Sequence, residues 1–339
     1  MSINQISRPV CILGLGLIGG SLMRALHEHG VDVFGHNRSP SATRKARAEG
    51  FDVTTDLTEA LSRAAESNAL IVLATPMPAV ASLLDALNEY APHCGFTDVV
   101  SVKGEVYALV KSRNMQDRYV GGHPMAGTAE SGWDASFPEL FRRAVWVVTF
   151  DHLVDSTEVS RTWKRLWIDV VHMATLVGAE VVPARVHAHD LAVARVSHLP
   201  HILAEALAIV GDNGGALALS LAAGSFRDAT RVAGTSPSLV RSMCETNHLA
   251  LGEALDECLR ILRDARAHLS PPQAEIQDLV DSGYRSRVRF EARSGLNASQ
   301  SVSPAKISNR PVFRLHHDGT DWANQLIQAE NLGARIEVL

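Results

Sequence analysis

The stretch "PVCILGLGLIGGSLMRALHEHG", residues 9–30, decides the fold of this chain. A short apolar run of the kind that forms a buried strand leads into a GxGxxG loop, and a helical pattern follows directly. In such a unit the first glycine permits a tight turn, the second lets a pyrophosphate approach the backbone, and the third allows the helix to pack closely on the strand. The stretch therefore predicts a dinucleotide-binding loop formed by Gly14, Gly16, Leu17, Ile18 and Gly19.

The end of the next predicted strand, residues 31–37, indicates which dinucleotide is bound. An NAD site has an acidic residue at this point, about 20 residues after the loop, to accept hydrogen bonds from the ribose. Here Asn37, Arg38 and Ser39 follow one another without a carboxylate. Arg38 can pair with a 2′-phosphate instead, helped by Ser39 and by Arg44 or Lys45. We predict NADP in preference to NAD, the alternative being that Arg38 is a solvated loop residue.

The wider pattern predicts two domains and an extension. Apolar runs alternate with helical patterns over residues 1–182, which favours an α/β Rossmann-like domain with a parallel sheet covered on both faces. A 3.6-residue periodicity then dominates residues 183–295 and predicts an all-α dimerisation domain, since its apolar content exceeds what one chain needs. Residues 296–339 are expected to form a linker and a short strand–helix–strand extension that packs on the body or on a partner.

Composition excludes several classes of protein. The chain has 339 residues, a formal net charge of −5 and 46% hydrophobic residues, so a nucleic-acid partner, which needs a basic patch, is not expected. We find no apolar run of about 18 residues and no signal-peptide layout, and we expect no membrane partner. The four cysteines are scattered without metal-ligand spacing, so we expect a cytoplasmic protein with no metal.

One histidine stands in an unusual setting, "YVGGHPMAGT" at residues 119–128. His123 lies between two glycines and Pro124, and such a backbone is shaped by those residues rather than by packing. We therefore expect the imidazole to be displayed rather than buried. Whether His123 acts in catalysis depends on which groups the rest of the chain places beside it.

Two further histidines lie in "HDLAVARVSHLPHILAEAL", residues 189–207, which we predict to be one helix. On it His198 and His201 share a stripe with Asp190, Ala194 and Glu205. A structural and a functional role for the two histidines remain equally open at this point. Metal binding is disfavoured because no third ligand is near.

A candidate anion-binding segment, "SFRDATRVAGTSP", follows at residues 225–237. It carries Arg227, Asp228 and Arg231 between a helix and a glycine-containing turn. The planar guanidinium fork of arginine suits a carboxylate, although a structural salt bridge explains these residues equally well.

Together these motifs give the chain a resemblance to a known family. They are "GLGLIGGSL" at the start, "ATP" at 74–76, "SVKG" at 101–104, "GGHPMAGT" at 121–128, "HDLAVARVSHLPH" at 189–201 and "SFRDATRVAGTSP" at 225–237. In their order and spacing, over about residues 8 to 295, the chain resembles the prephenate/arogenate dehydrogenases of tyrosine biosynthesis. The likeness is greatest to the actinobacterial members, including the tail.

The resemblance implies an oxidative decarboxylation and places it on residues. The substrate is a cyclohexadiene with a ring carboxylate and a hydroxyl on the opposite carbon. His123 matches the catalytic histidine that accepts the hydroxyl proton, and Ser101 matches a catalytic serine that contacts both groups. Arg231 matches the arginine that holds the ring carboxylate.

The resemblance also implies further contacts. The substrate pocket is expected to include His198, His201 and Thr128. Gly224 and Asp228 match a segment that approaches the substrate site of the neighbouring subunit in a homodimer. The cofactor contacts are expected to include Asn37, Arg38, Ser39, Thr75 and Pro76.

One departure from the family pattern bears on the substrate. Many members have Glu directly after the "GT" of this motif, whereas here Ala129 comes first and Glu130 follows. An ion pair with Arg231 that gates the pocket is therefore in doubt. Arogenate carries an ammonium group that prephenate lacks, so Glu130 favours arogenate. We predict an NADP-linked enzyme that acts on arogenate, on prephenate, or on both.

Two alternatives were weighed. A β-hydroxyacid dehydrogenase shares this domain arrangement but needs a catalytic lysine on the first long helix of the helical domain, and the helix here has none. A non-catalytic NADP-binding regulator has no reason to keep His123, Ser101 and Arg231 together. Feedback inhibition by tyrosine stays open, because no complete regulatory domain is recognisable.

Overall fold

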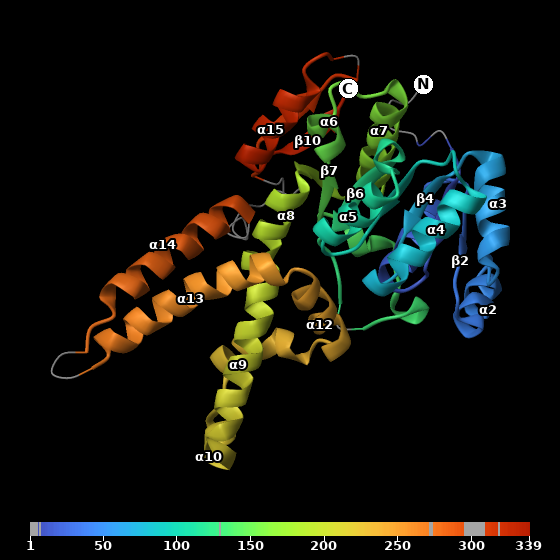
Figure 1. Cartoon of the computed structure of the whole chain (residues 1–339). Coiled ribbons are helices and arrows are strands. Elements are labelled where there is room, and N and C mark those ends of the chain that lie inside the picture. The colour runs from blue at the N-terminus through green and yellow to red at the C-terminus, as the bar shows by residue number, and fades with distance from the viewer. Residues whose placement is uncertain (1–5, 7, 129, 271–273, 295–308, 318) are drawn as a thin grey trace, which may run out of the picture.

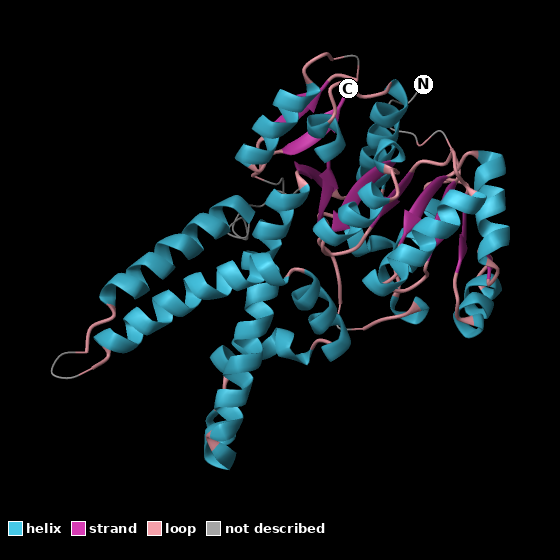
Figure 2. Ribbon diagram, viewed as in Figure 1, coloured by secondary structure: helices cyan, strands magenta, loops and turns pink. Residues whose placement is uncertain are grey.

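The computed structural model describes residue 6 and residues 8–128, 130–270, 274–294, 309–317 and 319–339. Ala129, a predicted break at Pro271-Pro272 and most of the predicted linker lie outside them. Figures 1 and 2 show a sheet with helices on both faces, a group of long helices that project from it, and a small C-terminal unit beside it.

An eight-stranded sheet forms the body, in the order β3-β2-β1-β4-β5-β6-β7-β8. Its strands are β1 (Val10–Leu13), β2 (Val33–His36), β3 (Asp52–Thr54), β4 (Leu70–Leu73), β5 (Phe96–Asp98), β6 (Tyr119–Pro124), β7 (Val145–Thr149) and β8 (Glu180–Ala184). The first six follow the doubly wound order of dinucleotide-binding folds, which confirms the predicted Rossmann-like class.

The expectation of a wholly parallel sheet is wrong at one junction. β7 pairs antiparallel with β6 and parallel with β8, while β1 to β6 are parallel to one another. The reason is the connection after β6, residues 125–144, whose described residues form only two 3₁₀ turns, η3 (Trp133–Ala135) and η4 (Pro138–Phe141). It does not carry the chain back across the sheet, so β7 starts at the edge where β6 ends.

Helices cover both faces of the sheet. They are α1 (Leu17–Glu28), α2 (Pro40–Ala48), α3 (Leu57–Ser67), α4 (Val80–Tyr90), α5 (Gly104–Ser112), α6 (Asp151–Asp155) and α7 (Arg161–Leu176), with 3₁₀ turns η1 (Met77–Ala79) and η2 (Gln116–Arg118). Alternation along β1 creates two cores. Val10 and Ile12 face one cluster with residues of α1 and α7, and Cys11 and Leu13 face another with residues of α3, α4 and α5.

The second region is helical. It comprises α8 (Val186–Val193), a π-helical turn η5 (Ala194–His198), α9 (Leu199–Asn213), α10 (Gly215–Leu221), α11 (Gly224–Thr230), the 3₁₀ turn η6 (Arg231–Gly234), α12 (Pro237–Thr246), α13 (His248–His268) and α14 (Gln277–Ser294). The single helix predicted over residues 189–207 is thus continuous but contains a π turn. Pro200 lies in the first turn of α9 and donates no backbone hydrogen bond, which favours this widening.

The continuous helix Val186–Asn213 is long and apolar enough to cross a membrane by length and composition, with a mean hydropathy of 1.3. This differs from the prediction that the sequence has no apolar run of about 18 residues. The helix nevertheless buries three polar side chains, His189, Asp190 and His198. Asp190 hydrogen-bonds to the start of α5, so this part of the helix packs on the sheet domain.

The C-terminal unit has the predicted strand–helix–strand order, with β9 (Val312–Leu315), α15 (Trp322–Leu332) and β10 (Arg335–Val338). Its two strands pair in parallel. The unit packs on the body: the ring of Trp322 lies 5.4 Å from that of Trp167, and the carboxylate of Glu330 accepts hydrogen bonds from Arg185 at 2.6 and 2.8 Å.

Candidate active site

The glycine loop has the geometry that a dinucleotide needs. Gly14 has a φ of +102°, and a Cβ there would lie 2.6 Å from the carbonyl oxygen of Ala74. A Cβ on Gly19 would lie 2.0 Å from the carbonyl oxygen of Gly14, so α1 packs against the loop too closely for any side chain. A Cβ on Gly16 would meet nothing within 4 Å. The backbone at Gly16 is therefore open to an incoming group.

Two neighbouring features also fit a bound dinucleotide. The N-terminus of α1 has no acidic residue in its first turn and no side-chain cap, so its N–H groups favour an anion. The hydroxyl oxygen of Thr75, at the end of β4, is buried and has no hydrogen-bond partner among the described residues. Buried hydroxyls are normally paired, so Thr75 is suited to a partner that the chain itself does not supply.

The groups predicted to read the ribose lie after β2. Arg38 is exposed and makes no ion pair with the described residues, and Ser39 caps α2 by accepting a hydrogen bond from Ala42 at 3.4 Å. Asn37 accepts a hydrogen bond from the backbone of Leu15 at 3.5 Å, which ties this end to the glycine loop. Lys45 is ion-paired to Asp134. Of the cations suggested beside Arg38, Lys45 thus already has a partner.

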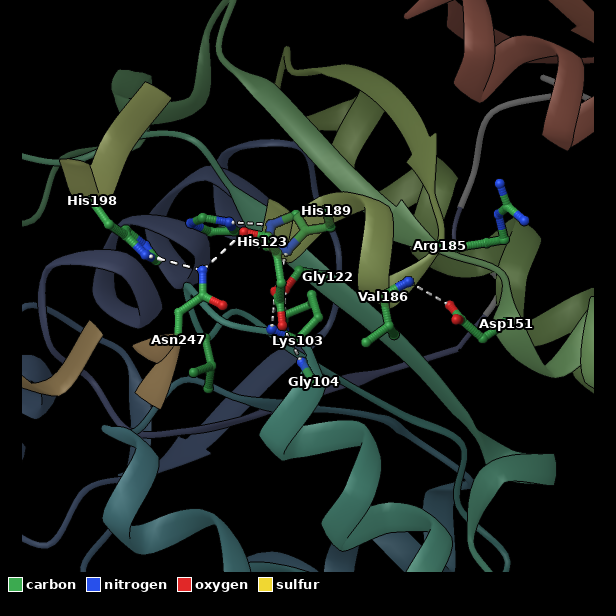
Figure 3. A network of polar contacts seen from close by, with 12 residues as sticks. Lys103, Gly104, Gly122, His123, Asp151, Arg185, Val186, His189, His198 and Asn247 are labelled. Carbon is green, nitrogen blue, oxygen red and sulfur yellow. Dashed lines mark hydrogen bonds and ion pairs between the residues drawn. The ribbon is translucent and has the colours of Figure 1, made fainter. Parts of the chain in front are cut away.

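His123 lies at the carboxyl end of β6 and is 8% exposed. The expectation that its ring is displayed is therefore wrong, because α8 covers it. Its Nδ1 lies 2.8 Å from Nε2 of His189, and Nδ1 of His189 lies 2.8 Å from a carboxylate oxygen of Asp190 (Figure 3). Burial, reinforced by His189, Lys103 and His198, holds the pKa of His123 well below its usual value. The ring is therefore neutral at pH 7.

A buried ion pair lies behind His123. The ammonium of Lys103 pairs with the carboxylate of Asp98, and both side chains are fully buried. Lys103 also donates to the carbonyl oxygen of Gly122 at 2.7 Å, and Tyr119 donates to Asp98 at 2.7 Å. These contacts hold β6 against the segment after β5, directly beside the histidine.

His198 and His201 lie on the other side of the site. His198 is 1% exposed, and its Nδ1 lies 3.2 Å from the side-chain nitrogen of Asn247, which also donates to the carbonyl oxygen of Asp190 at 2.9 Å. Burial lowers the pKa of His198 to about 4. His201 is half-buried, and its Nδ1 has no partner among the described residues. His198, in the π turn, is thus linked through Asn247 to the backbone of α8.

The remaining predicted residues are not all brought together within one chain. Ser101 is half-buried, two residues before Lys103. Arg231 is exposed at the start of η6 and makes no ion pair with any described residue, although its charge reaches His201. Thr128 is exposed and exchanges hydrogen bonds with Glu130 at 3.3 Å. Gly224 and Asp228 belong to α11, which packs on α9.

Both regions of the chain match one known protein family. Residues 22–171 match the family described as "Prephenate dehydrogenase, nucleotide-binding domain", and residues 185–282 match "Prephenate dehydrogenase, dimerization domain". Prephenate dehydrogenase of Bacillus subtilis is 30% identical over 80% of this chain and 73% of its own length. The chain belongs to the prephenate dehydrogenase family.

Two solved structures resemble this chain in their fold as well as in their sequence. A candidate prephenate dehydrogenase of Corynebacterium glutamicum is 62% identical, with a TM-score of 0.93 over 99% of this chain and 100% of that one. Synechocystis arogenate dehydrogenase is 28% identical, with a TM-score of 0.69 over 83% and 99%. The chain is accordingly an oxidoreductase of the prephenate and arogenate dehydrogenase class, which uses a nicotinamide cofactor for oxidative decarboxylation. This decides against both alternatives that the sequence left open.

Four residues of the candidate site were not singled out from the sequence: His189, Lys103, Asp98 and Asn247. His189 and Lys103 stand inside motifs that were recognised, "HDLAVARVSHLPH" and "SVKG", so a polar residue in each was a detectable signal. Asp98 lies within the β-rich run at residues 96–102, and Asn247 lies between two helices. No pattern along the chain distinguishes either of them, because their partners are remote in sequence.

A cavity of about 1300 Å³ lies elsewhere, at the amino ends of the parallel strands. It is lined by residues that include Pro9, Asn68, Gly95 and Arg118, and by none of the predicted site residues. Ligands of doubly wound sheets bind at the carboxyl ends of the strands, where the glycine loop and His123 lie. The cavity is therefore not the candidate active site of this dehydrogenase.

Proposed function

We propose that this chain catalyses the NADP-dependent oxidative decarboxylation of arogenate to tyrosine, of prephenate to 4-hydroxyphenylpyruvate, or of both, with His123 as the proton acceptor. The observation that carries the proposal is the position of His123, a buried and neutral imidazole at the carboxyl end of β6. The glycine loop, at the end of β1, opens on the same edge of the sheet. A proton acceptor and a dinucleotide site thus share one edge.

The chain's own groups divide the work as follows. The neutral ring of His123 removes the proton of the ring hydroxyl, a role worth roughly 10²–10⁴ in rate for a positioned base. Ser101, two residues before the buried Lys103, is assigned the contact with the same hydroxyl. When bound, the nicotinamide accepts the hydride that leaves the hydroxyl-bearing carbon. Loss of carbon dioxide then makes the ring aromatic, so the overall step does not reverse.

Substrate anchoring is assigned to Arg231, His198, His201 and Thr128. Arg231 has no ion-pair partner in the described part of the chain, so its planar fork is available for the ring carboxylate. The neutral rings of His198 and His201 can donate or accept hydrogen bonds without adding charge. Glu130 is exposed, seven residues after His123 in the sequence, and its carboxylate would favour the ammonium of arogenate, which is why arogenate is the preferred substrate.

The dinucleotide is assigned to Gly14, Gly16, Leu17, Ile18, Gly19, Asn37, Arg38, Ser39, Thr75 and Pro76. NADP is preferred over NAD because the end of β2 offers Arg38 and Ser39 and no carboxylate. The open backbone at Gly16 and the unpaired hydroxyl of Thr75 support a cofactor at this loop.

A homodimer is part of the proposal. Many large apolar side chains of the helical region are exposed in one chain, among them Ile209, Val210, Leu217, Leu221, Leu249 and Tyr284, each at least 60% exposed. So much apolar exposure on the helices of a single chain favours a protein partner. In the dimer, α11 with Gly224 and Asp228 would approach the neighbour's site. Light scattering that shows a monomer at micromolar concentration would reject this arrangement.

We place the enzyme in the cytoplasm, where thiols stay reduced. Cys11, Cys94 and Cys244 are free and buried, and burial raises the pKa of each thiol. Such thiols are unreactive and form no disulfide framework.

The experiment that tests the proposed function compares the two substrates with the two cofactors. Steady-state kinetics of the purified enzyme are measured for arogenate and prephenate, each with NADP and with NAD. We expect the highest kcat/KM for arogenate with NADP. Faster turnover of prephenate with NAD would overturn both preferences, and no turnover in any combination would overturn the activity itself.

A further inference from the structure

His123 lies at one end of a row of hydrogen-bonded polar groups. The proposed mechanism assigns no role to the other groups of this row. From His123 on β6 the row runs to His189 (Figure 3), and from there to Asp190; both residues are on α8. The carboxylate of Asp190 also accepts the backbone N–H groups of Lys103 at 2.9 Å and Gly104 at 2.8 Å. These two N–H groups open α5, so the carboxylate lies at a helix N-terminus that favours its negative charge.

The protonation states of His189 and His123 follow from that of Asp190, at the far end of this row of groups. Burial alone would raise the pKa of Asp190, but the hydrogen bonds from His189 and from the two backbone N–H groups outweigh it, and the pKa lies below its usual value. An ionised carboxylate only accepts hydrogen bonds, so Nδ1 of His189 carries a proton. Burial lowers the pKa of His189 against the pull of Asp190, so its ring is neutral and that proton is its only one.

The tautomer of His123 is then determined. Nε2 of the neutral His189 has a lone pair and no proton, and it lies 2.8 Å from Nδ1 of His123. A hydrogen bond at this distance requires the proton to be on His123. The neutral ring of His123 therefore has its proton on Nδ1, and its basic lone pair is on Nε2, the nitrogen remote from His189.

We propose that His189 and Asp190 are positioning residues that hold His123 in the Nδ1–H tautomer and present its Nε2 to the substrate hydroxyl. The proposal rests on the proposed function of His123 as the proton acceptor. In the reaction the hydroxyl proton moves to Nε2, while the Nδ1 proton stays in its hydrogen bond to His189. The imidazolium that forms keeps its acceptor, and Asp190 stays ionised.

A further hydrogen bond holds Asp190, and with it His189, in position. Asn247, between α12 and α13, donates to the carbonyl oxygen of Asp190 at 2.9 Å. α8 is thus tied to the start of α5 through the carboxylate of Asp190. It is tied to the junction of α12 and α13 through the backbone carbonyl of the same residue. Because His189 is 2% exposed, the ring has no room to rotate away from His123.

The test uses two substitutions of His189 in the full-length enzyme. Leucine removes the acceptor, and we expect kcat to fall roughly 10²-fold, within the range that a positioned base contributes, with KM changed less than about threefold. Glutamine can accept from His123 through its oxygen and donate to Asp190 through its nitrogen, so His189→Gln should recover kcat to within about tenfold of the parent. A matched control is His152→Leu, a half-buried histidine on α6 outside the site, which should leave kcat unchanged.

A direct measurement does not depend on how these variants fold. In the unsubstituted enzyme labelled with ¹⁵N-histidine, NMR reports which ring nitrogen of His123 carries the proton, and its signal is assigned by its loss in His123→Asn. We expect a protonated Nδ1 and an unprotonated Nε2. A protonated Nε2, or a His189→Leu variant with kcat within twofold of the parent, would overturn the positioning role of His189 and Asp190.

The two levels of the account fail separately. If His123→Asn is inactive while His189→Leu is fully active, the positioning role of His189 is wrong, and His123 remains the general base. If His123→Asn keeps full activity, the proposed function itself is wrong.

Discussion

Lys103 and Asp98 form an ion pair in which both side chains are fully buried, immediately behind the strand that carries His123. Burial lowers the pKa of Lys103 despite the carboxylate of Asp98 beside it. A buried pair of this kind adds little net stability compared with apolar residues, but breaking it leaves an uncompensated charge in the core. The pair also holds the carbonyl group of Gly122, the residue before His123.

We therefore predict that Lys103→Met destabilises the protein by about 3–5 kcal/mol, because Asp98 stays buried without a cation. Arg113→Ala is the control: it breaks the surface pair of Arg113 with Asp85 and should cost less than about 1 kcal/mol. Urea denaturation of both variants measures the difference. A loss for Lys103→Met no larger than that of the control would contradict this account of the pair.

The glycine loop gives a prediction that separates binding from folding. Gly16→Ala places a methyl group where the chain leaves open space, so we expect an unchanged Tm within a few degrees and a KM for NADP raised at least about tenfold. Gly19→Ala places a methyl group 2.0 Å from the carbonyl oxygen of Gly14, so it should lower Tm strongly. Differential scanning calorimetry and initial rates check the two. Equal effects of the two substitutions on Tm would show that the loop is not built as described.

Arg38 is expected to decide the cofactor preference. Without its guanidinium, the 2′-phosphate loses a charge-assisted hydrogen bond worth about 1.5–3 kcal/mol, so Arg38→Ser should raise the KM for NADP roughly 10- to 100-fold. The KM for NAD should stay the same. Arg47→Ser, which removes an exposed cation farther along the same helix α2, serves as the matched control. A preference that survives Arg38→Ser would place the specificity on other residues.

His198 predicts how stability depends on pH. Its pKa is about 4 in the folded chain, against 6.5 for an unperturbed histidine, chiefly because of burial. Between these values the unfolded chain binds a proton that the folded chain does not, so stability falls as the pH is lowered from about 6.5 to about 4. The shift corresponds to a loss on the order of 3 kcal/mol. Above pH 6.5 the contribution is constant.

His198→Asn keeps an acceptor for Asn247 but cannot titrate, so its stability should fall less steeply over this range. Chemical denaturation at a series of pH values compares it with the parent. Parallel curves for the two proteins would mean that His198 does not titrate as described.

Much of the fold was predictable because it depends on local patterns. The strand, the GxGxxG loop and α1 lie within about twenty consecutive residues, and the doubly wound order follows from their repetition. The reversal at β7 was not predictable, because it depends on the path of residues 125–144, where glycines and short turns leave no periodic signal. The π turn at Ala194–His198 was missed for a related reason, since Pro200 is compatible with an ordinary helix start.

The candidate site was predictable only in part. His123 was singled out, but its burial was not, because the helix that covers it begins more than 60 residues later. His189 and Asp190 gain their meaning from atoms of β6 and α5, and a sequence pattern does not show which remote backbone N–H groups meet a carboxylate. Arg231, Gly224 and Asp228 lie on the helical region, where a second chain is expected to complete the surroundings.

The central claim is that His123 accepts the substrate proton, and His123→Asn tests it most directly. Turnover is measured under the best substrate and cofactor conditions, and binding of the cofactor and substrate is measured by calorimetry on the same variant. The account predicts that kcat falls by at least about 10²-fold while both dissociation constants stay within a few-fold of the parent. A variant that keeps the parent's kcat would contradict it.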